Sequence, residues 1–207
     1  GMAGNIRAGN TSVLNFQDGF FDGAEKLSAQ SICDEFRVGM HSCYACPIRC
    51  KKKVKTDGPW AADPIYGGPE YETIAAFGPN CGVSDIRAIC KAHDLCNRHG
   101  LDTISAGVTI SFAMECFERG ILTSTDTGGY DLTFGNAQAM LQLLEQIVHR
   151  QGLGDLLAEG TKRAAGKIGQ GAADFAIQVK GLELPMHDPR LKQGMGIHYS
   201  THATGAD

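Results

Sequence analysis

The sequence has no long apolar run, no excess of basic charge and no internal repeat, and these absences exclude several classes of protein. No stretch approaches the roughly 18 consecutive apolar residues that a membrane-spanning helix needs, and the first residues lack the charged-then-apolar order of a secretion signal. The 207 residues carry a formal net charge of −4, which gives no general attraction to nucleic acid. Because 43% of the residues are hydrophobic, the chain can bury a core. We therefore expect a soluble, cytoplasmic protein that binds neither membranes nor nucleic acid.

Patterns typical of β-strands are scarce. Only residues 175–184 (FAIQVKGLEL) give a good strand signal, whereas apolar residues at i, i+3 and i+4 recur over other segments and predict helices. Ser84 is the expected N-cap of one helix, and Gly100 and Gly120 are placed to end two helices in the left-handed conformation. The predicted helices cover residues 24–36, 84–99, 103–119, 136–151 and 153–168.

The segments between these helices are long and rich in glycine and proline. Residues 4–22 lack periodicity, residues 55–70 hold three prolines and three glycines, and the chain from residue 181 onward shows no closing helix. The expected fold class is therefore mostly α, a multihelical domain over residues 2–207 with long Gly/Pro-rich loops and a sub-boundary near residues 120–135. The C-terminal pattern indicates part of something larger, or a domain that needs a partner.

Three of the eight cysteines form a cluster, and metal binding explains it better than disulfides in a chain without an export signal. Cys43, Cys46 and Cys50 have the spacing C-x2-C-x3-C, and thiolates in such a run can converge on an iron–sulfur cluster. These clusters usually have four cysteine ligands, so the run predicts a fourth ligand elsewhere. The reverse spacing is typical of radical enzymes that use S-adenosylmethionine, so the observed order argues against that class. The single cysteines are expected to be small core residues: Cys33, Cys81, Cys90, Cys96 and Cys116.

Two alternatives to an iron–sulfur cluster stay open on spacing alone. His41 lies two residues before Cys43, so a Cys3His zinc site is the direct competitor, although zinc ribbons usually present paired C-x2-C elements. The other alternative is no metal. The lysines that follow are expected either to form a solvated charged run or to raise the potential of an anionic cluster and attract an acidic electron-transfer partner: Lys51, Lys52 and Lys53.

Two further groups of residues could carry chemistry. Glu70 and Glu72 lie at i and i+2, where they do not face each other, so they are expected to stabilise a helix N-terminus or to leave one carboxylate for acid–base work. His198 and His202 have a workable metal spacing, but their glycine-rich surroundings favour a loop with incidental histidines. His187, in LPMHDPR, is the histidine that we expect near a substrate channel.

Several segments together closely resemble one known family, and they cover nearly the whole chain in the family's order. The family is that of the tungsten-dependent aldehyde:ferredoxin oxidoreductases, whose C-terminal region is similar to this sequence. Even the segment before the cysteines, LNFQDGFFDGAEKLS (14–28), is similar to its counterpart. The other matching segments are CYACPIRC (43–50), GGPEYETIAAFGPNCGVSD (67–85), LCNRHGLDTISAGVTISFAMECFERG (95–120) and VKGLELPMHDPR (179–190).

The resemblance implies an activity and its cofactors. Enzymes of this family oxidise small aldehydes to carboxylic acids at a tungsten ion held by two tungstopterins, and pass the electrons through one [4Fe–4S] cluster to ferredoxin. Molybdenum with molybdopterin stays open as a replacement for tungsten. The resemblance also implies that Cys43, Cys46 and Cys50 are the first three cluster ligands, and that Glu72 lies near the metal and assists proton movement.

The match to the family's pterin segment comes with two departures. Asn97 stands where the family has aspartate, so a charged contact becomes neutral. The family's E-x-x-H pair for an interface iron aligns with Lys91 and Asp94, so we expect that mononuclear iron site to be absent. The pterin contacts that the resemblance implies come from NRHGLD: Asn97, Gly100, Leu101 and Asp102.

By the same resemblance, parts of the enzyme lie outside these 207 residues. A β-rich pterin-binding domain would precede residue 1, and a second pterin segment, the fourth cluster cysteine and a catalytic histidine would follow Asp207. We therefore expect the chain alone to be inactive. Two rival hypotheses are a non-catalytic iron–sulfur or zinc-binding module and a plain interaction domain with reduced thiols, and the identity of any bound metal distinguishes them.

Overall fold

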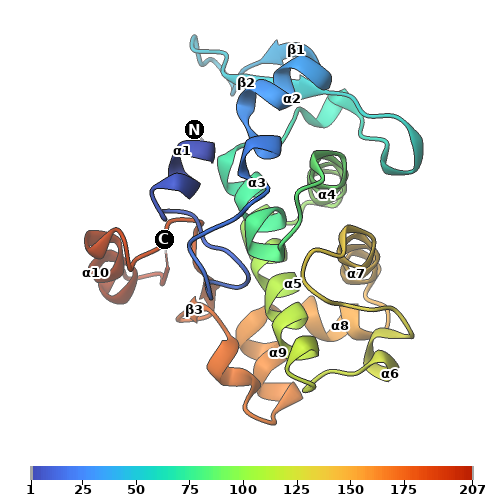
Figure 1. Cartoon of the computed structure of the whole chain (residues 1–207), viewed down its shortest axis with the longest axis vertical. Coiled ribbons are helices and arrows are strands. Elements are labelled where there is room, and N and C mark those ends of the chain that lie inside the picture. The colour runs from blue at the N-terminus through green and yellow to red at the C-terminus, as the bar shows by residue number, and fades with distance from the viewer. Residues whose placement is uncertain (1, 207) are drawn as a thin grey trace.

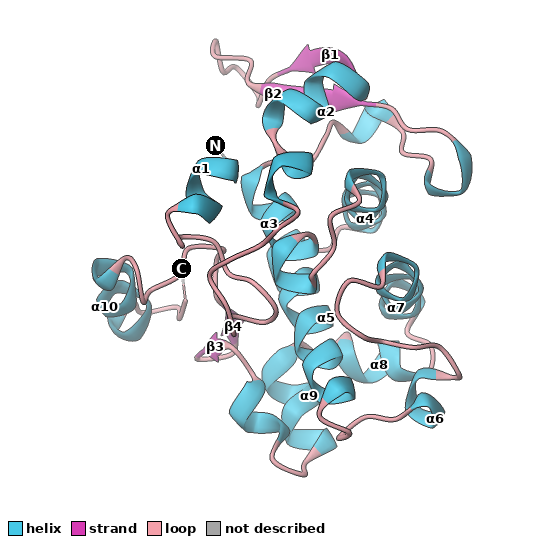
Figure 2. Cartoon of the chain, viewed as in Figure 1, coloured by secondary structure: helices cyan, strands magenta, loops and turns pink. Residues whose placement is uncertain are grey.

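Helices dominate the computed structural model, which describes residues 2–206 (Figure 1, Figure 2). The expected mostly α fold is therefore confirmed. Within the described residues, no helix has both the length and the apolar character that crossing a membrane requires. The α-helices are α1 (Met2–Arg7), α2 (Ala29–Glu35), α3 (Tyr71–Phe77), α4 (Ile86–His99), α5 (Thr103–Glu118), α6 (Ser124–Thr127), α7 (Ala137–His149), α8 (Leu153–Leu157), α9 (Thr161–Ile168) and α10 (Gln193–Thr201).

Helix α5 forms the centre of the core, and its residues from Ala106 to Cys116 are all buried. It contacts α3, α4, α7 and α9, which explains why it is buried on every side rather than along one stripe. Helix α3 lies close to it at Gly107, where an added Cβ would lie 2.6 Å from the Ala76 Cβ. Glycine at this position therefore fixes how near α3 can lie to α5.

Side chains and glycines define the ends of the two long central helices. Gly100 follows α4 with a φ of 70°, and Gly120 follows α5 with a φ of 72°, as the sequence predicts. The predicted N-cap of α4, Ser84, is wrong. Asp85 caps the helix instead, because its carboxylate accepts a hydrogen bond from the Arg87 amide at 2.9 Å and complements the helix dipole.

Two predicted helices are interrupted, whereas a predicted loop is confirmed. The helix expected over residues 153–168 is split into α8 and α9, because Gly160 takes a φ of 85°. The helix expected over residues 24–36 begins as a 3-10 turn and restarts at Ser28, whose hydroxyl accepts the Ser31 amide as the N-cap of α2. Residues 55–70 contain short 3-10 turns and otherwise remain a loop (Figure 2).

The first of two small hairpins stands at one end of the molecule and carries the cysteine cluster. Strand β1 (Arg37–His41) pairs antiparallel with β2 (Lys51–Val54), and residues 42–50 form the connecting loop. Ala45 and Arg49 take φ angles of 54° and 52°, which turn this loop. Figure 1 shows the loop projecting beyond the helices, so it is open to solvent or to a partner.

The second hairpin replaces the single strand predicted over residues 175–184. Strands β3 (Gln178–Val179) and β4 (Leu182–Glu183) pair antiparallel. Lys180 and Gly181 take φ angles of 57° and 93° between them and reverse the chain. The strand signal was therefore real, but it belongs to two very short strands.

Two segments predicted to be irregular contain helices. Residues 4–22 overlap α1, which buries Met2 and Ile6 against the core. The prediction that no helix follows residue 181 is wrong, since α10 lies near the C-terminal end (Figure 1). Only Tyr199 of α10 is buried, so no apolar stripe in the sequence indicates this helix.

Candidate functional site

The structure places the three clustered cysteines on one loop but does not gather them around one point. Cys43 and Cys50 are exposed and Cys46 is half-buried, and all three are free thiols. The Cys46 amide donates to the Cys43 carbonyl oxygen at 3.0 Å, which closes a turn between the first two. Among residues 2–206, no three His, Cys, Asp or Glu side chains are arranged to hold a metal. Three thiols are the donor type that iron–sulfur clusters use.

Large apolar side chains surround these thiols without cover. Tyr44 is fully exposed beside Cys43, and Ile48 is largely exposed between Cys46 and Cys50. Val38 and Met40 are exposed on β1. Exposed apolar groups gathered in one place mark surfaces that other groups cover, so this hairpin has the character of a contact surface.

Four of the five other cysteines lie in the core, as predicted. Burial raises the pKa of Cys90, Cys96 and Cys116 to about 12, and it raises the pKa of Cys81 further. At neutral pH these groups are protonated and inert. Cys33, on α2, is only half-buried, so the core prediction is wrong for it.

The second strand of the cysteine hairpin packs directly on the segment that leads into α3. The Val54 amide donates to the Gly67 carbonyl oxygen at 3.0 Å. A Cβ added at Gly68 would lie 2.7 Å from Val54 Cγ1, so the two segments touch. Lys52 Nζ lies 3.7 Å from Glu70 Oε1 across this contact. Lys52 therefore serves the packing of the hairpin and is not part of a fully solvated charged run.

The two glutamates of PEYET have separate surroundings. Glu70 is the N-cap of α3, but its side chain makes no capping hydrogen bond and pairs with Lys52 instead. Glu72 lies in the first turn of α3, where the Met186 amide donates to Oε2 at 2.8 Å and His187 Nε2 lies 3.1 Å from Oε1. Glu72 is thus the glutamate that joins a cluster of polar groups.

This Glu72–His187 cluster brings together three distant parts of the chain. The Tyr71 ring stacks on the His187 ring with centroids 5.1 Å apart. The Tyr71 hydroxyl donates to the Met186 carbonyl oxygen at 2.8 Å and lies 3.0 Å from Thr11 Oγ1. Burial raises the pKa of Tyr71, so its hydroxyl stays protonated. Sequence reasoning missed Tyr71 and Thr11, because a tyrosine and a threonine in isolation carry no signal for this role.

The predicted pterin segment forms the exposed corner between α4 and α5. Gly100 turns the chain there, Leu101 is half-buried, and its amide donates to the Cys96 carbonyl oxygen at 2.8 Å. Asp102 caps α5 by accepting the Ser105 amide at 2.7 Å. Asn97 donates its side-chain amide to the His93 carbonyl oxygen at 2.8 Å. The corner is thus held by local bonds and presents Asn97, Gly100 and Asp102 to solvent.

The residues aligned with the family's interface iron pair form ion pairs with one another. Lys91 Nζ lies 3.7 Å from the buried carboxylate of Asp94. Arg98 lies 3.2 Å from the same carboxylate, and the Asp63 amide donates to it at 3.0 Å. Asp94 is therefore satisfied by protein groups.

His198 and His202 lie together at the end of α10, with ring centroids 4.9 Å apart. The prediction of a loop is therefore wrong for His198, which is helical, and right for His202, which follows the last turn. His202 Nδ1 lies 2.9 Å from Thr204 Oγ1, so one of its nitrogens is engaged. The pair has no third metal-binding partner among the described residues.

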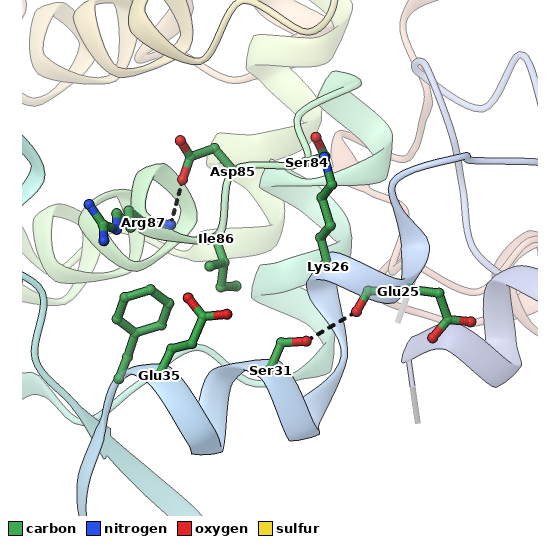
Figure 3. A pocket seen from close by; sticks show the side chains of 9 residues that line it. Glu25, Lys26, Ser31, Glu35, Ser84, Asp85, Ile86 and Arg87 are labelled. Carbon is green, nitrogen blue, oxygen red and sulfur yellow. Dashed lines mark hydrogen bonds between the residues drawn. The ribbon is translucent and has the colours of Figure 1, made fainter.

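A wide groove lies away from these residues. It has a volume of about 660 Å³, and Figure 3 shows Ser31 donating to the Glu25 carbonyl oxygen and Asp85 accepting from Arg87 at its walls. None of the predicted site residues lines it. A cavity of about 100 Å³ lies beside the predicted pterin segment, where Leu101 and Asp102 line it.

Comparisons with known proteins agree with these features. Residues 2–207 match the family described as aldehyde ferredoxin oxidoreductase, domains 2 and 3. The tungsten-containing aldehyde ferredoxin oxidoreductase of Thermococcus kodakarensis is 40% identical over 194 residues, which are 92% of this chain and 31% of that protein. The Pyrococcus furiosus enzyme of the same name is 37% identical over 197 residues, again covering 31% of its length.

Two further relatives have other names. The aliphatic sulfonate oxidoreductase, WOR-like subunit, of Pyrococcus furiosus is 37% identical over 203 residues, which are 94% of this chain and 32% of that protein. The active-site complex BamBC of benzoyl coenzyme A reductase has a similar structure, with a TM-score of 0.74 and 27% identity, over 96% of this chain and 30% of that one. This chain thus spans about a third of the length of its relatives. The chain belongs to the aldehyde ferredoxin oxidoreductase family.

Proposed function

We propose that this chain is a section of an enzyme that oxidises small aldehydes to carboxylic acids and delivers the electrons to ferredoxin. One observation carries the proposal: the loop with Cys43, Cys46 and Cys50 rests, through β2, on the segment that leads to Glu72. A thiolate-rich site and a proton-accepting group are thereby built into one unit. Oxidation of an aldehyde releases electrons and protons, so the enzyme needs an electron acceptor and a proton acceptor close together.

The cysteine loop is the proposed site of a [4Fe–4S] cluster. Its three thiols are the right donors, and they are accessible. Four of the five other cysteines are buried and held protonated in the core. The proposed fourth ligand comes from outside these residues. The exposed Tyr44 and Ile48 would be covered by the same neighbouring part of the enzyme.

The corner between α4 and α5 is the proposed contact to a tungstopterin or molybdopterin. Asn97, Gly100 and Asp102 are exposed there, and Leu101 is half-buried. Such a cofactor supplies the two-electron redox chemistry of the metal. The polar side chains and backbone of this rigid corner would hold the pterin, with Asn97 contributing a neutral contact.

Glu72 is the proposed proton acceptor. It is half-buried, and its carboxylate is held by the Met186 amide and His187 rather than by a lysine or arginine. A carboxylate fixed in this way can accept a proton as water adds to an aldehyde carbonyl, and general acid–base catalysis contributes about 10²–10⁴-fold to a rate. Glu70, which pairs with Lys52, has no such role.

Glu72→Gln in the complete enzyme tests this assignment, with Glu70→Gln as the matched control. We expect Glu72→Gln to lower kcat for aldehyde oxidation by about 10²–10⁴-fold and Glu70→Gln to leave it nearly unchanged. The substrate panel should include aliphatic sulfonates and aromatic thioesters. One relative is named an aliphatic sulfonate oxidoreductase, and the similar structure is that of a benzoyl coenzyme A reductase. Activity on one of those classes, with none on aldehydes, would reject the proposed substrate.

Anaerobic reconstitution of the 207-residue chain with iron and sulfide tests the cluster site. We expect sub-stoichiometric or three-iron clusters, measured by iron and sulfide content and by electron paramagnetic resonance after reduction. Cys43→Ser should abolish this uptake, whereas Cys33→Ser should not affect it. A complete, stable four-iron cluster would show that the fourth ligand lies within the chain, and selective zinc uptake would rule out electron transfer at this site.

A further inference from the structure

We propose that His187 is a positioning residue that fixes the Glu72 carboxylate through its Nε2–H group. The inference deepens the proposed function and rests on it only for the step that Glu72 performs. It assigns His187 a defined tautomer and a defined task. Both follow from the contacts of the Glu72–His187 cluster.

Both oxygens of the Glu72 carboxylate have a protein partner. The backbone amide of Met186 donates to Oε2 at 2.8 Å, and His187 Nε2 lies 3.1 Å from Oε1. Two adjacent residues thus contact the carboxylate, one at each oxygen. Each oxygen keeps one lone pair free, so the group can still accept a proton.

The ring of His187 is itself held in place from several directions. Tyr71 stacks on one face, with an interplanar angle of 20°. The Asp188 amide donates to the Asn10 carbonyl oxygen at 2.9 Å, and the His187 amide donates to the Pro185 carbonyl oxygen at 2.7 Å. The Tyr199 hydroxyl from α10 donates to the His187 carbonyl oxygen at 3.3 Å. The imidazole is therefore part of a rigid frame.

Asn10 determines which ring nitrogen carries the proton. Its side-chain nitrogen lies 3.3 Å from His187 Nδ1 and 3.3 Å from Asn5 Oδ1, so its two N–H groups have two acceptors. When Asn10 donates to Nδ1, this nitrogen is unprotonated and the proton of the neutral imidazole lies on Nε2. The protonated Nε2 then lies 3.1 Å from Glu72 Oε1. Only 2% of the surface of Asn10 is exposed, so water does not compete with its side chain for Nδ1.

Nitrogen-15 spectroscopy of the histidine rings in the 207-residue chain tests the tautomer without any cofactor. We expect the neutral His187 ring to show the Nε2–H form, with an unprotonated Nδ1. Asn10→Leu should return the ring to a mixture of tautomers. Solvent-exposed His198, which lies outside the cluster, provides the internal control. A tautomer mixture for His187 that Asn10→Leu leaves unchanged would overturn the proposal.

Two amide variants of the complete enzyme separate positioning from a general structural role. In His187→Gln the side-chain N–H reaches the place of Nε2, whereas in His187→Asn it reaches only the place of Nδ1. We expect kcat to fall less than about 5-fold in His187→Gln and about 10–100-fold in His187→Asn, with similar melting temperatures. Equal losses in the two variants would overturn the positioning role. If the enzyme does not oxidise aldehydes, the tautomer result still stands, so the two proposals fail separately.

Discussion

The buried carboxylate of Glu115 accepts a hydrogen bond from the side-chain amide of Asn15 at 2.7 Å, although 100 positions separate the two residues. Arg119 donates to the other oxygen of Glu115 at 2.8 Å. The Asn15 amide oxygen accepts the Ser111 hydroxyl at 3.2 Å. A buried polar network therefore attaches the N-terminal segment to α5. The same segment carries Asn10 and Thr11, which contact His187 and Tyr71 in the Glu72–His187 cluster.

Asn15→Ala should lower the free energy of unfolding by about 2–4 kcal/mol. The change leaves Oε2 of the buried Glu115 without its Asn15 donor, and an unsatisfied buried group costs about 1–3 kcal/mol. It also places alanine at a φ of 53°, a left-handed conformation that costs roughly 1–2 kcal/mol. Urea unfolding at neutral pH measures the difference.

Asn136→Ala is the matched control for that variant. Its side chain accepts the Ala139 amide at 3.1 Å as the N-cap of α7, and losing such a cap costs about 1 kcal/mol. Equal destabilisation by the two variants would mean that the buried network contributes little.

Gly107→Ala should destabilise the fold, whereas Gly166→Ala should stabilise it slightly. Both glycines lie inside helices, but a Cβ at Gly107 would lie 2.6 Å from the Ala76 Cβ, and one at Gly166 meets nothing within 4 Å. Overpacking costs about 1–3 kcal/mol, and glycine to alanine in an open helix gains about 0.5–1 kcal/mol. Thermal unfolding of both variants checks the two signs. A stabilised Gly107→Ala would show that α3 moves easily against α5.

Alkylation of the native chain at pH 8 should separate the cysteines into two groups. Cys43, Cys46 and Cys50 should react first, because they are accessible. Cys90 and Cys96 should react only after unfolding, since they are buried and their pKa is raised to about 12, so the thiolate is scarce. Peptide mapping by mass spectrometry identifies the labelled sites. Rapid labelling of Cys90 would contradict the packing of α4.

The stability of the fold should fall as the pH drops below about 6.5, in part because of His93. Burial lowers the pKa of His93, whose Nε2 lies 3.0 Å from the Tyr66 carbonyl oxygen. Below the unfolded pKa the unfolded chain binds a proton that the folded chain does not, so unfolding becomes easier, and the loss ends at the lowered folded pKa. Asp94, Glu70 and Lys51 act on the same group with smaller effects.

Urea midpoints at pH 7.5 and pH 5.0 measure this dependence, and His93→Gln should make it shallower. His149→Gln is the control, because His149 is exposed on the last turn of α7. If the two variants have the same pH dependence as the wild type, other groups determine acid stability.

Local rules were enough to predict the central helices. Asp102 and Gly100 lie at sequence positions where capping chemistry is explicit, so the corner between α4 and α5 follows from neighbouring residues. The cysteine hairpin did not follow, because β1 is exposed along most of its length and shows no burial pattern. Helix α10 was missed for a similar reason, since it buries only Tyr199.

The candidate site was predictable only where its residues are close in sequence. The spacing of Cys43, Cys46 and Cys50 is a local signal, and the cysteines do share one loop. The Met186 amide and Glu72 lie 114 positions apart, and no pattern along the chain relates them. Such contacts depend on how the helices pack around α5, which periodicity does not describe.

The contact at Gly68 restricts how the length of this chain can vary. Strand β2 lies against this residue with no space for a side chain, and the first turn of α3 begins three residues later. An insertion between Cys50 and Val54, or between Gly68 and Glu72, would shift the thiols or the carboxylate relative to this contact. The loop of residues 55–66 starts and ends at the contact, so it can lengthen without moving either group. The turn at Gly128 and Gly129 has open space around both residues and contacts neither. Homologous chains should therefore differ in length at that turn and in the loop of residues 55–66, while the intervals from Cys50 to Val54 and from Gly68 to Glu72 stay constant.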